Sequence, residues 1–127
     1  MEERKITSGL RTLFLVHGVV GLVFGLAMLF IPESTGDWVN WPVEDVMAWR
    51  VIGAATMAFA ASSLLAYSRS LYSEVKLIIQ MEMVWTALAA LIYLWGQFFA
   101  DKPDIGWLWV IVMGAFAVAF SYYGIAE

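Results

Sequence analysis

Four stretches without a charged side chain take up most of this chain, and they decide what it can fold into. They are Thr12–Ile31, Val51–Ser68, Met83–Ala100 and Ile105–Ala126. A membrane hydrocarbon core of about 30 Å is crossed by roughly 20 mainly apolar residues in a helix, which is close to the length of each stretch. Only 14% of the residues are charged and 62% are apolar, whereas soluble chains average about 25% and about 45–50%. The sequence therefore predicts a membrane protein.

The lipid environment also restricts the secondary structure, because backbone groups inside the membrane must be hydrogen-bonded within the protein. We expect an all-α integral membrane four-helix bundle that forms a single domain over residues 1–127. Its predicted spans lie at roughly 10–31, 44–68, 75–100 and 104–125. Pro32, Pro42 and Pro103 stand at the ends of these spans, where a missing N–H is tolerated. Asp45 and Asp104 lie at predicted helix starts, where a carboxylate complements the helix dipole.

The distribution of Lys and Arg predicts the orientation, because short loops rich in these residues stay in the cytoplasm. Five of them fall on one side of the predicted spans, namely Arg4, Lys5, Arg11, Arg69 and Lys76. The other side carries Lys102 and, near its edge, Arg50. We therefore place both termini in the cytoplasm. The acidic outer face with few basic residues suits a plasma membrane.

Composition excludes several classes of function. A net charge of −4 and a pI near 4.8 exclude a nucleic-acid binding protein. The chain has no Cys and one His, so it offers no thiolate or multi-histidine metal site. No nucleophile–base pair, phosphate-binding loop or pair of carboxylates can be assembled from its residues. We therefore expect no enzyme activity, no metal and no cofactor.

Glu82 is the strongest candidate for a functional side chain, because an ionisable group at membrane depth costs about 2.5–3.5 kcal/mol on insertion scales. At about 1.5 Å per residue it lies roughly 15 Å from the cytoplasmic end of its span. Three further polar residues share its helix face, namely Thr86, Tyr93 and Gln97. Glu82 is expected to be a buried hydrogen-bonding group that fixes helix packing, a ligand contact, a proton or ion relay, or one half of a charge pair with a partner subunit.

Arg50 and His17 are the other ionisable candidates within or near the spans. Arg50 either anchors its helix at the outer interface, pairs with Glu82, or binds an anionic headgroup or substrate. His17 is expected to be a hydrogen-bonded packing residue, although a ligand role and proton transfer with Glu82 are alternatives.

Small residues predict where helices approach closely. Gly21 and Gly25 form a GxxxG spacing in the first span, and Ala54, Ala58 and Ser62 form a similar row in the second. We expect both rows to pack within the chain, with self-association as the alternative.

A short pattern resembles a known family. Pro32 ends the first span, and Arg50, Val51, Ile52, Gly53 and Ala54 open the second after a short outer loop. In a four-span chain of this size, the pattern resembles the DoxX-like group of small membrane proteins. The resemblance implies a four-helix bundle that in some members is a subunit of a respiratory or redox assembly, and a role close to a quinone. The absence of Cys argues against thiol chemistry here, and no catalytic residue is carried over.

Three functions remain open from the sequence. The first is a non-catalytic accessory or assembly subunit that contacts another membrane protein or its own copies, with Trp107 and Trp109 in the contact. The second is a binder of a hydrophobic molecule such as a lipid, sterol-like compound or quinone, with Glu82 and Arg50 at its polar end. The third is a small proton-coupled transporter or channel that uses Glu82. All three place the chain among membrane lipids.

Overall fold

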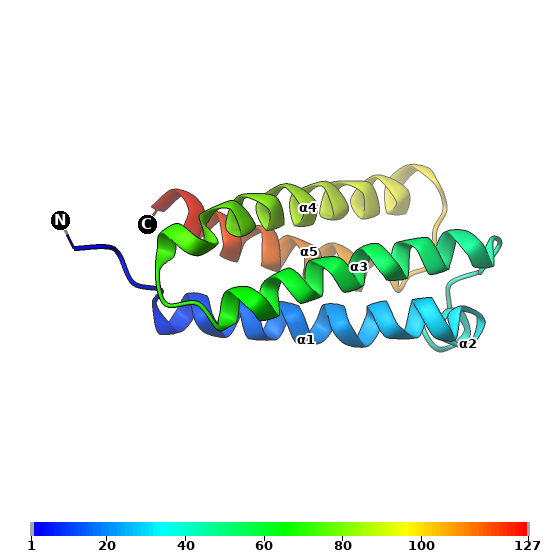
Figure 1. The fold of residues 1–127 in the computed structure, drawn as a ribbon. Helices are drawn as coiled ribbons and strands as arrows, with labels where there is room; N and C mark the ends of the chain where they lie inside the picture. Colours follow the sequence, from blue (N-terminus) through cyan, green and yellow to red (C-terminus); the bar gives the residue numbers. More distant parts are fainter. Residues whose placement is uncertain (1, 127) are drawn as a thin grey trace. The chain divides into compact units, whose positions relative to one another are not determined.

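The computed structural model describes residues 2–126, in which every regular element is a helix (Figure 1). The elements are α1 (Ser8–Phe30), α2 (Pro32–Trp38), α3 (Val46–Tyr67), α4 (Tyr72–Phe99), α5 (Gly106–Ser121) and a short π-helix, η1 (Tyr122–Ala126). Four of these helical segments are long and apolar enough to cross a membrane. The predicted all-α fold with four spans is therefore confirmed.

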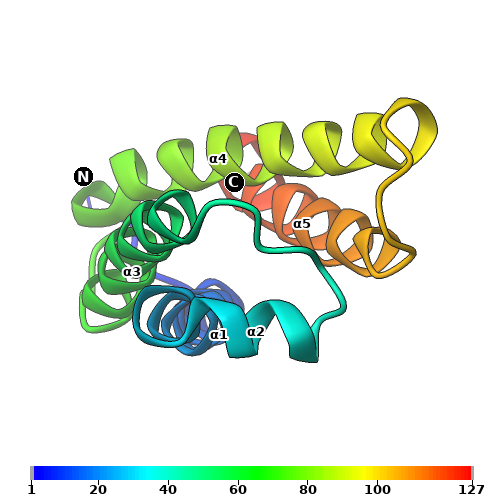
Figure 2. The same ribbon diagram turned by 90° about the vertical axis from the view of Figure 1, so that its right-hand side faces the viewer.

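Contacts divide the chain into two compact units, and each unit contains a helical hairpin. The first hairpin, Ile6–Ser70, contains α1, α2 and α3, with α1 and α3 side by side along their lengths (Figures 1 and 2). The second hairpin contains α4, α5 and η1. The head, which we define as residues 2–5, belongs to the second hairpin, although the first hairpin follows it directly in sequence.

The helix ends agree with the predicted spans to within a few residues, and their caps explain the differences. Asp45 caps α3, because its Oδ1 accepts hydrogen bonds from the N–H groups of Met47 at 3.0 Å and Ala48 at 3.2 Å. α4 begins at Tyr72, earlier than predicted, where Glu74 Oε2 accepts the Leu71 N–H at 3.1 Å. These side chains satisfy backbone donors that a first helical turn leaves open.

The start of α5 differs from the prediction. No side chain caps this helix, which begins at Gly106. Asp104 contributes its backbone carbonyl instead, which accepts the Trp107 N–H at 3.0 Å. Asp104 thus lies two residues before the first residue of α5, and the complementarity of its carboxylate to the helix dipole stays a prediction.

The connection between α1 and α3 contains a helix that the sequence analysis did not predict. Pro32 occupies the first turn of α2, where its missing N–H costs no hydrogen bond. The chain then turns back, with a positive φ of 52° at Asn40 and a hydrogen bond from Trp41 N to Gly36 O at 2.9 Å. A Cβ on Gly36 would lie 2.7 Å from the Trp41 carbonyl oxygen and would also collide with Val43. Glycine therefore permits this close turn, and α2 lies beyond the end of α1 (Figure 2).

Candidate functional site

α1 and α3 approach each other along a line of small residues, which we call the glycine seam. It comprises Gly18, Gly21 and Gly25 on α1 and Gly53 and Ala60 on α3. A Cβ added to Gly53 would lie 2.7 Å from the backbone nitrogen of Leu29 and 2.9 Å from the carbonyl oxygen of Gly25. The two backbones are thus in direct contact, which only glycine allows at this separation. Gly21 and Gly25 lie in this contact within the chain.

The row predicted on the second span is corrected. Ala54 and Ala58 are exposed, and the seam is formed by Gly53 and Ala60 instead. Successive helical residues are about 100° apart around the axis, so Ala54 lies about a quarter turn from Gly53. The face of α3 that contacts α1 carries Gly53. An alanine at this position would place its Cβ against the α1 backbone, so the contact requires glycine there.

His17 is buried inside the first hairpin, with a relative exposure of 5%. Its Nδ1 is hydrogen-bonded to Oγ of Ser63 at 2.8 Å, and Ser63 is fully buried. This bond connects α1 to α3 directly beside Gly18, the first residue of the glycine seam. This hydrogen bond agrees with the predicted packing role of His17, and the ligand and proton-transfer alternatives stay predictions.

Arg11 closes the first hairpin at the opposite end from α2. Its guanidinium donates hydrogen bonds to the carbonyl oxygens of Tyr67 at 2.7 Å and Arg69 at 2.9 Å. These carbonyls follow the last turn of α3, where the helix leaves acceptors without intrahelical partners. Arg11, which the sequence analysis used only for orientation, is therefore a positioning residue. The sequence feature that could have indicated this role is its position directly before the first apolar run.

Glu82 and Thr86 occupy the centre of the buried stripe of α4. The buried residues of this helix are Val75, Ile79, Glu82, Thr86, Ala89 and Gly96. Their spacing follows the three- and four-residue steps of one helix face. Glu82 and Thr86 each have a relative exposure of 0%. Thr86 Oγ1 donates to the backbone carbonyl of Glu82 at 2.6 Å, so its hydroxyl is used inside the helix.

The outer half of the predicted polar stripe makes contacts within the second hairpin. The Tyr93 ring stacks on Trp109 of α5, with centroids 6.4 Å apart. Gln97 Nε2 donates to the carbonyl oxygen of Pro103 at 3.2 Å, which ties the end of α4 to the turn that follows. Tyr93 and Gln97 therefore position α5 against α4. They are not brought together with Glu82, from which they are separated by two or more helical turns.

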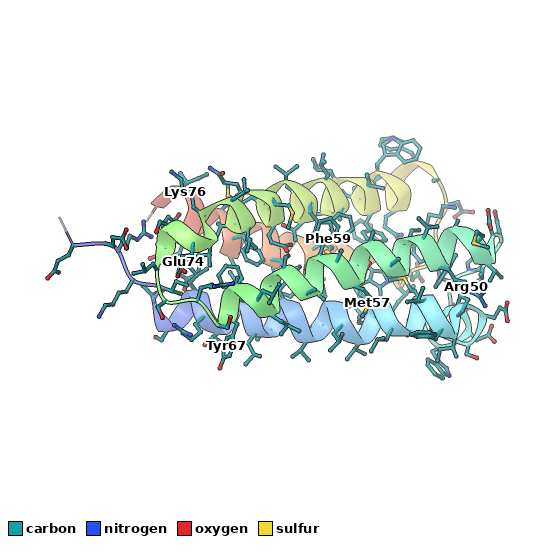
Figure 3. All side chains as sticks on the ribbon, viewed as in Figure 1. Arg50, Met57, Phe59, Tyr67, Glu74 and Lys76 are labelled. Atoms are coloured by element: carbon teal, nitrogen blue, oxygen red, sulfur yellow. The ribbon has the colours of Figure 1, made fainter. Side chains whose placement is uncertain are left out.

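Arg50 lies near the start of α3, and Tyr67 marks the opposite end of the same helix (Figure 3). The Arg50 side chain is exposed. Among residues 2–126, its guanidinium takes part in no hydrogen bond or ion pair. Arg50 and His17 belong to the first hairpin and Glu82 to the second, so a pairing of either residue with Glu82 stays a prediction.

Comparison of the chain with protein-family models, curated protein sequences and solved structures finds no match.

Proposed function

We propose that this chain is a multi-pass protein of the plasma membrane with both termini in the cytoplasm, and that it is a non-catalytic accessory or assembly subunit of a membrane complex. The four apolar helices support the multi-pass arrangement. Within each hairpin most of the basic residues lie at one end, and a single one, Arg50 or Lys102, lies at the other, which supports the orientation. The first hairpin has Arg11 and Arg69 at that end, and the second has the head and Lys76.

One observation carries the accessory function: α3 exposes a face of small residues that its contact with α1 does not use. We call it the alanine face, and it comprises Ala54, Ala58 and Ala61. Arg50 precedes Ala54 by one turn on the same side of the helix. Exposed small residues in a membrane helix permit close approach of a second helix, and this approach gains van der Waals contact that lipid does not provide. The alanine face therefore suits a helix of another membrane protein.

Arg50 adds specificity to this face. A guanidinium one turn inside an apolar helix requires a polar counterpart, and the described part of the first hairpin supplies none. A partner helix with an acidic side chain at that level would pair with it. The polar side chains elsewhere in the spans, such as His17 and Gln97, are used in contacts that hold each hairpin. Their use in packing favours a scaffold over a catalytic or transport role.

Membership of the DoxX-like group is part of this proposal. The residues that carry this resemblance lie on two different faces of α3. Gly53 lies in the glycine seam, whereas Arg50 and Ala54 are exposed. This arrangement suits a helix that packs against α1 with one face and against a partner protein with another. A respiratory or redox assembly is the class of complex that the resemblance suggests.

Native mass spectrometry of the protein extracted gently from its own membranes tests the proposal. We expect a stoichiometric extra mass of protein size. Replacing Ala58 with Leu should remove that mass, because the larger side chain keeps the partner helix away. The matched control is Ala115→Leu, which makes the same change at an exposed position of α5 and should leave the mass in place. A bare monomer in the wild type, or loss of the extra mass with both variants, would contradict the accessory function.

A second candidate function is supported by the full burial of Glu82 and Thr86 in α4. Binding of a lipid or quinone, or proton-coupled transport, would give the carboxyl group a role at that depth. A retained mass of a few hundred daltons in the same experiment would favour this candidate. Glu82→Gln should then abolish binding or flux while the protein still inserts and purifies. A variant that only lowers yield and melting temperature would assign Glu82 to packing.

A further inference from the structure

The head is held against the start of α4 by backbone hydrogen bonds. Lys5 and Leu71 form an antiparallel bridge, and the Tyr72 N–H donates to the carbonyl oxygen of Arg4 at 2.8 Å. Both partners belong to the second hairpin. Two segments far apart in the sequence are thus adjacent at the first turn of α4.

Tyr72 is the centre of this arrangement. The Arg4 guanidinium lies over the Tyr72 ring, 3.8 Å from its centroid. The Tyr72 hydroxyl donates to the carbonyl oxygen of Tyr123 in η1 at 2.9 Å. Lys76 follows Tyr72 by one helical turn and therefore lies on the same face of α4. Figure 3 shows Lys76 and Glu74 on the first turns of this helix.

The head and α4 together form a basic surface, which we define as Arg4, Lys5 and Lys76. All three side chains are exposed. Within the described residues, the ammonium groups of Lys5 and Lys76 make no hydrogen bond or ion pair. Glu74 Oε2 accepts the Leu71 N–H in the cap of α4. Glu2 and Glu3 precede the basic surface and are exposed, so they reduce its positive potential without covering it.

The surface of α4 changes character directly after Lys76. Gln80 follows Lys76 by one turn, is exposed, and makes no hydrogen bond with residues 2–126. Exposed apolar side chains continue along the helix at Leu77, Val84 and Leu88, with relative exposures of 76%, 60% and 54%. Leu77 lies beside Lys76, and the exposed side chains beyond Gln80, such as Val84 and Leu88, are apolar, so the cationic end of α4 is followed first by an amide and then by apolar side chains. A phospholipid presents the complementary order of phosphate, ester carbonyl and acyl chain.

We propose that this side of α4 is a binding site for an anionic phospholipid. Lys5 and Lys76, beside Arg4, hold the phosphate. The Gln80 amide donates to a glycerol-ester carbonyl, since it lies about 6 Å further along the helix axis. An acyl chain lies along Leu77, Val84 and Leu88. The continuous apolar face after the polar groups selects a lipid over free phosphate. This site is separate from the alanine face and does not depend on the accessory function.

The test is native mass spectrometry of the purified full chain with phosphatidylglycerol and phosphatidylcholine that carry identical acyl chains. The wild type should retain phosphatidylglycerol more strongly. A basic residue near an anionic surface contributes about a fivefold gain in binding, so Lys5→Gln with Lys76→Gln should weaken phosphatidylglycerol binding roughly 25-fold. Phosphatidylcholine retention should change much less. Gln80→Leu should weaken both lipids about equally, because they share the ester carbonyl.

Lys102→Gln is the matched control, because Lys102 is exposed in the same hairpin at the turn after α4. It should leave lipid retention unchanged, whereas Glu2→Gln with Glu3→Gln should raise phosphatidylglycerol retention by removing negative charge. All the replaced side chains are exposed, so melting temperatures should match the wild type. Equal retention of the two lipids by the wild type would overturn the proposal. So would an equal loss with Lys102→Gln, or complete competition by soluble glycerophosphate at the lipid's own concentration.

Discussion

The two hairpins are held together in different ways. In the first, backbone meets backbone along the glycine seam, where α1 presents only glycines and the side chains of Met57 and Leu64 from α3 pack over two of them. In the second, aromatic rings supply contacts between α4 and α5, such as the stack of Tyr93 on Trp109 and the edge-to-face pair of Phe98 and Trp107. Membrane helices gain little from apolar burial against each other, because lipid is equally apolar. Close packing therefore stabilises each hairpin, and it is achieved by very small or very large residues.

This difference predicts opposite sensitivities. The first hairpin should be damaged by added atoms, since its backbones leave no space for them. The second should be damaged when rings are removed, since these rings fill the space between its helices. The following experiments measure unfolding free energy in mild detergent by denaturant titration, and they are ordered by expected effect.

Gly53→Ala should have the largest effect. Its new Cβ would lie 2.7 Å from Leu29 N, a backbone atom that cannot move aside without shifting α1. We expect a loss of about 3 kcal/mol, typical of severe overpacking. Gly114→Ala in α5 is the control, because a Cβ there meets nothing within 4 Å. It should be neutral or gain up to about 1 kcal/mol from helix propensity. Equal effects of the two variants would refute the backbone contact.

Arg11→Met should follow, because it removes two charged hydrogen bonds to carbonyls after α3. We expect a loss of about 2 kcal/mol. The second hairpin offers the matched change at Gln97, whose neutral amide makes a single bond to Pro103 O. Gln97→Met should cost about 1 kcal/mol. If Gln97→Met lowered the unfolding free energy more than Arg11→Met, the prediction that two charged hydrogen bonds stabilise more than one neutral bond would be wrong.

Trp109→Ala should destabilise the second hairpin by about 1.5 kcal/mol, the upper range for a lost aromatic pair. Trp38→Ala in the first hairpin is the control, since Trp38 is 71% exposed. It should change the unfolding free energy little. Because Tyr93 and Trp109 stack on each other, replacing either should give the same loss, and replacing both should cost less than the sum. Additive losses would mean that the stack contributes nothing.

Ser63→Ala should have the smallest effect. It removes the hydrogen bond to His17, and such bonds between membrane helices contribute about 0.6 kcal/mol on average. Ser62→Ala is the neighbouring control, because Ser62 Oγ donates to the Phe59 carbonyl within its own helix. That change should cost less than Ser63→Ala. The opposite order would show that the bond between α1 and α3 does not stabilise the first hairpin.

Span number, span positions and turn locations could be predicted because they depend on local properties of the sequence. An apolar run of sufficient length forms a helix in lipid wherever it occurs. Pro32 and Asp45 then mark boundaries through their own backbone and side-chain chemistry. The GxxxG spacing at Gly21 and Gly25 was also sufficient to predict close approach, since small residues four apart leave one helix face without bulky side chains.

The pairing face of α3 could not be predicted in the same way. A helix that is apolar all around gives no periodic signal to distinguish one side from another. Gly53 and Ala54 are adjacent small residues, and either could have faced α1. Only the position of the α1 backbone shows that Gly53 does. The bonds of Arg11 to Tyr67 and Arg69, and of the head to Leu71 and Tyr72, join residues far apart in sequence. No local pattern marks such contacts.

The pairing of the head with the start of α4 has a consequence for biosynthesis. The first hairpin is a compact unit over Ile6–Ser70, so its own contacts can form as soon as those residues have been inserted. The head is synthesised before the first hairpin, yet its partner at Leu71 emerges only after the whole of that hairpin. Chains fold from the N-terminus as they are made. The head must therefore wait for the middle of the chain, and a nascent chain that stops at Ser70 would carry an unattached head.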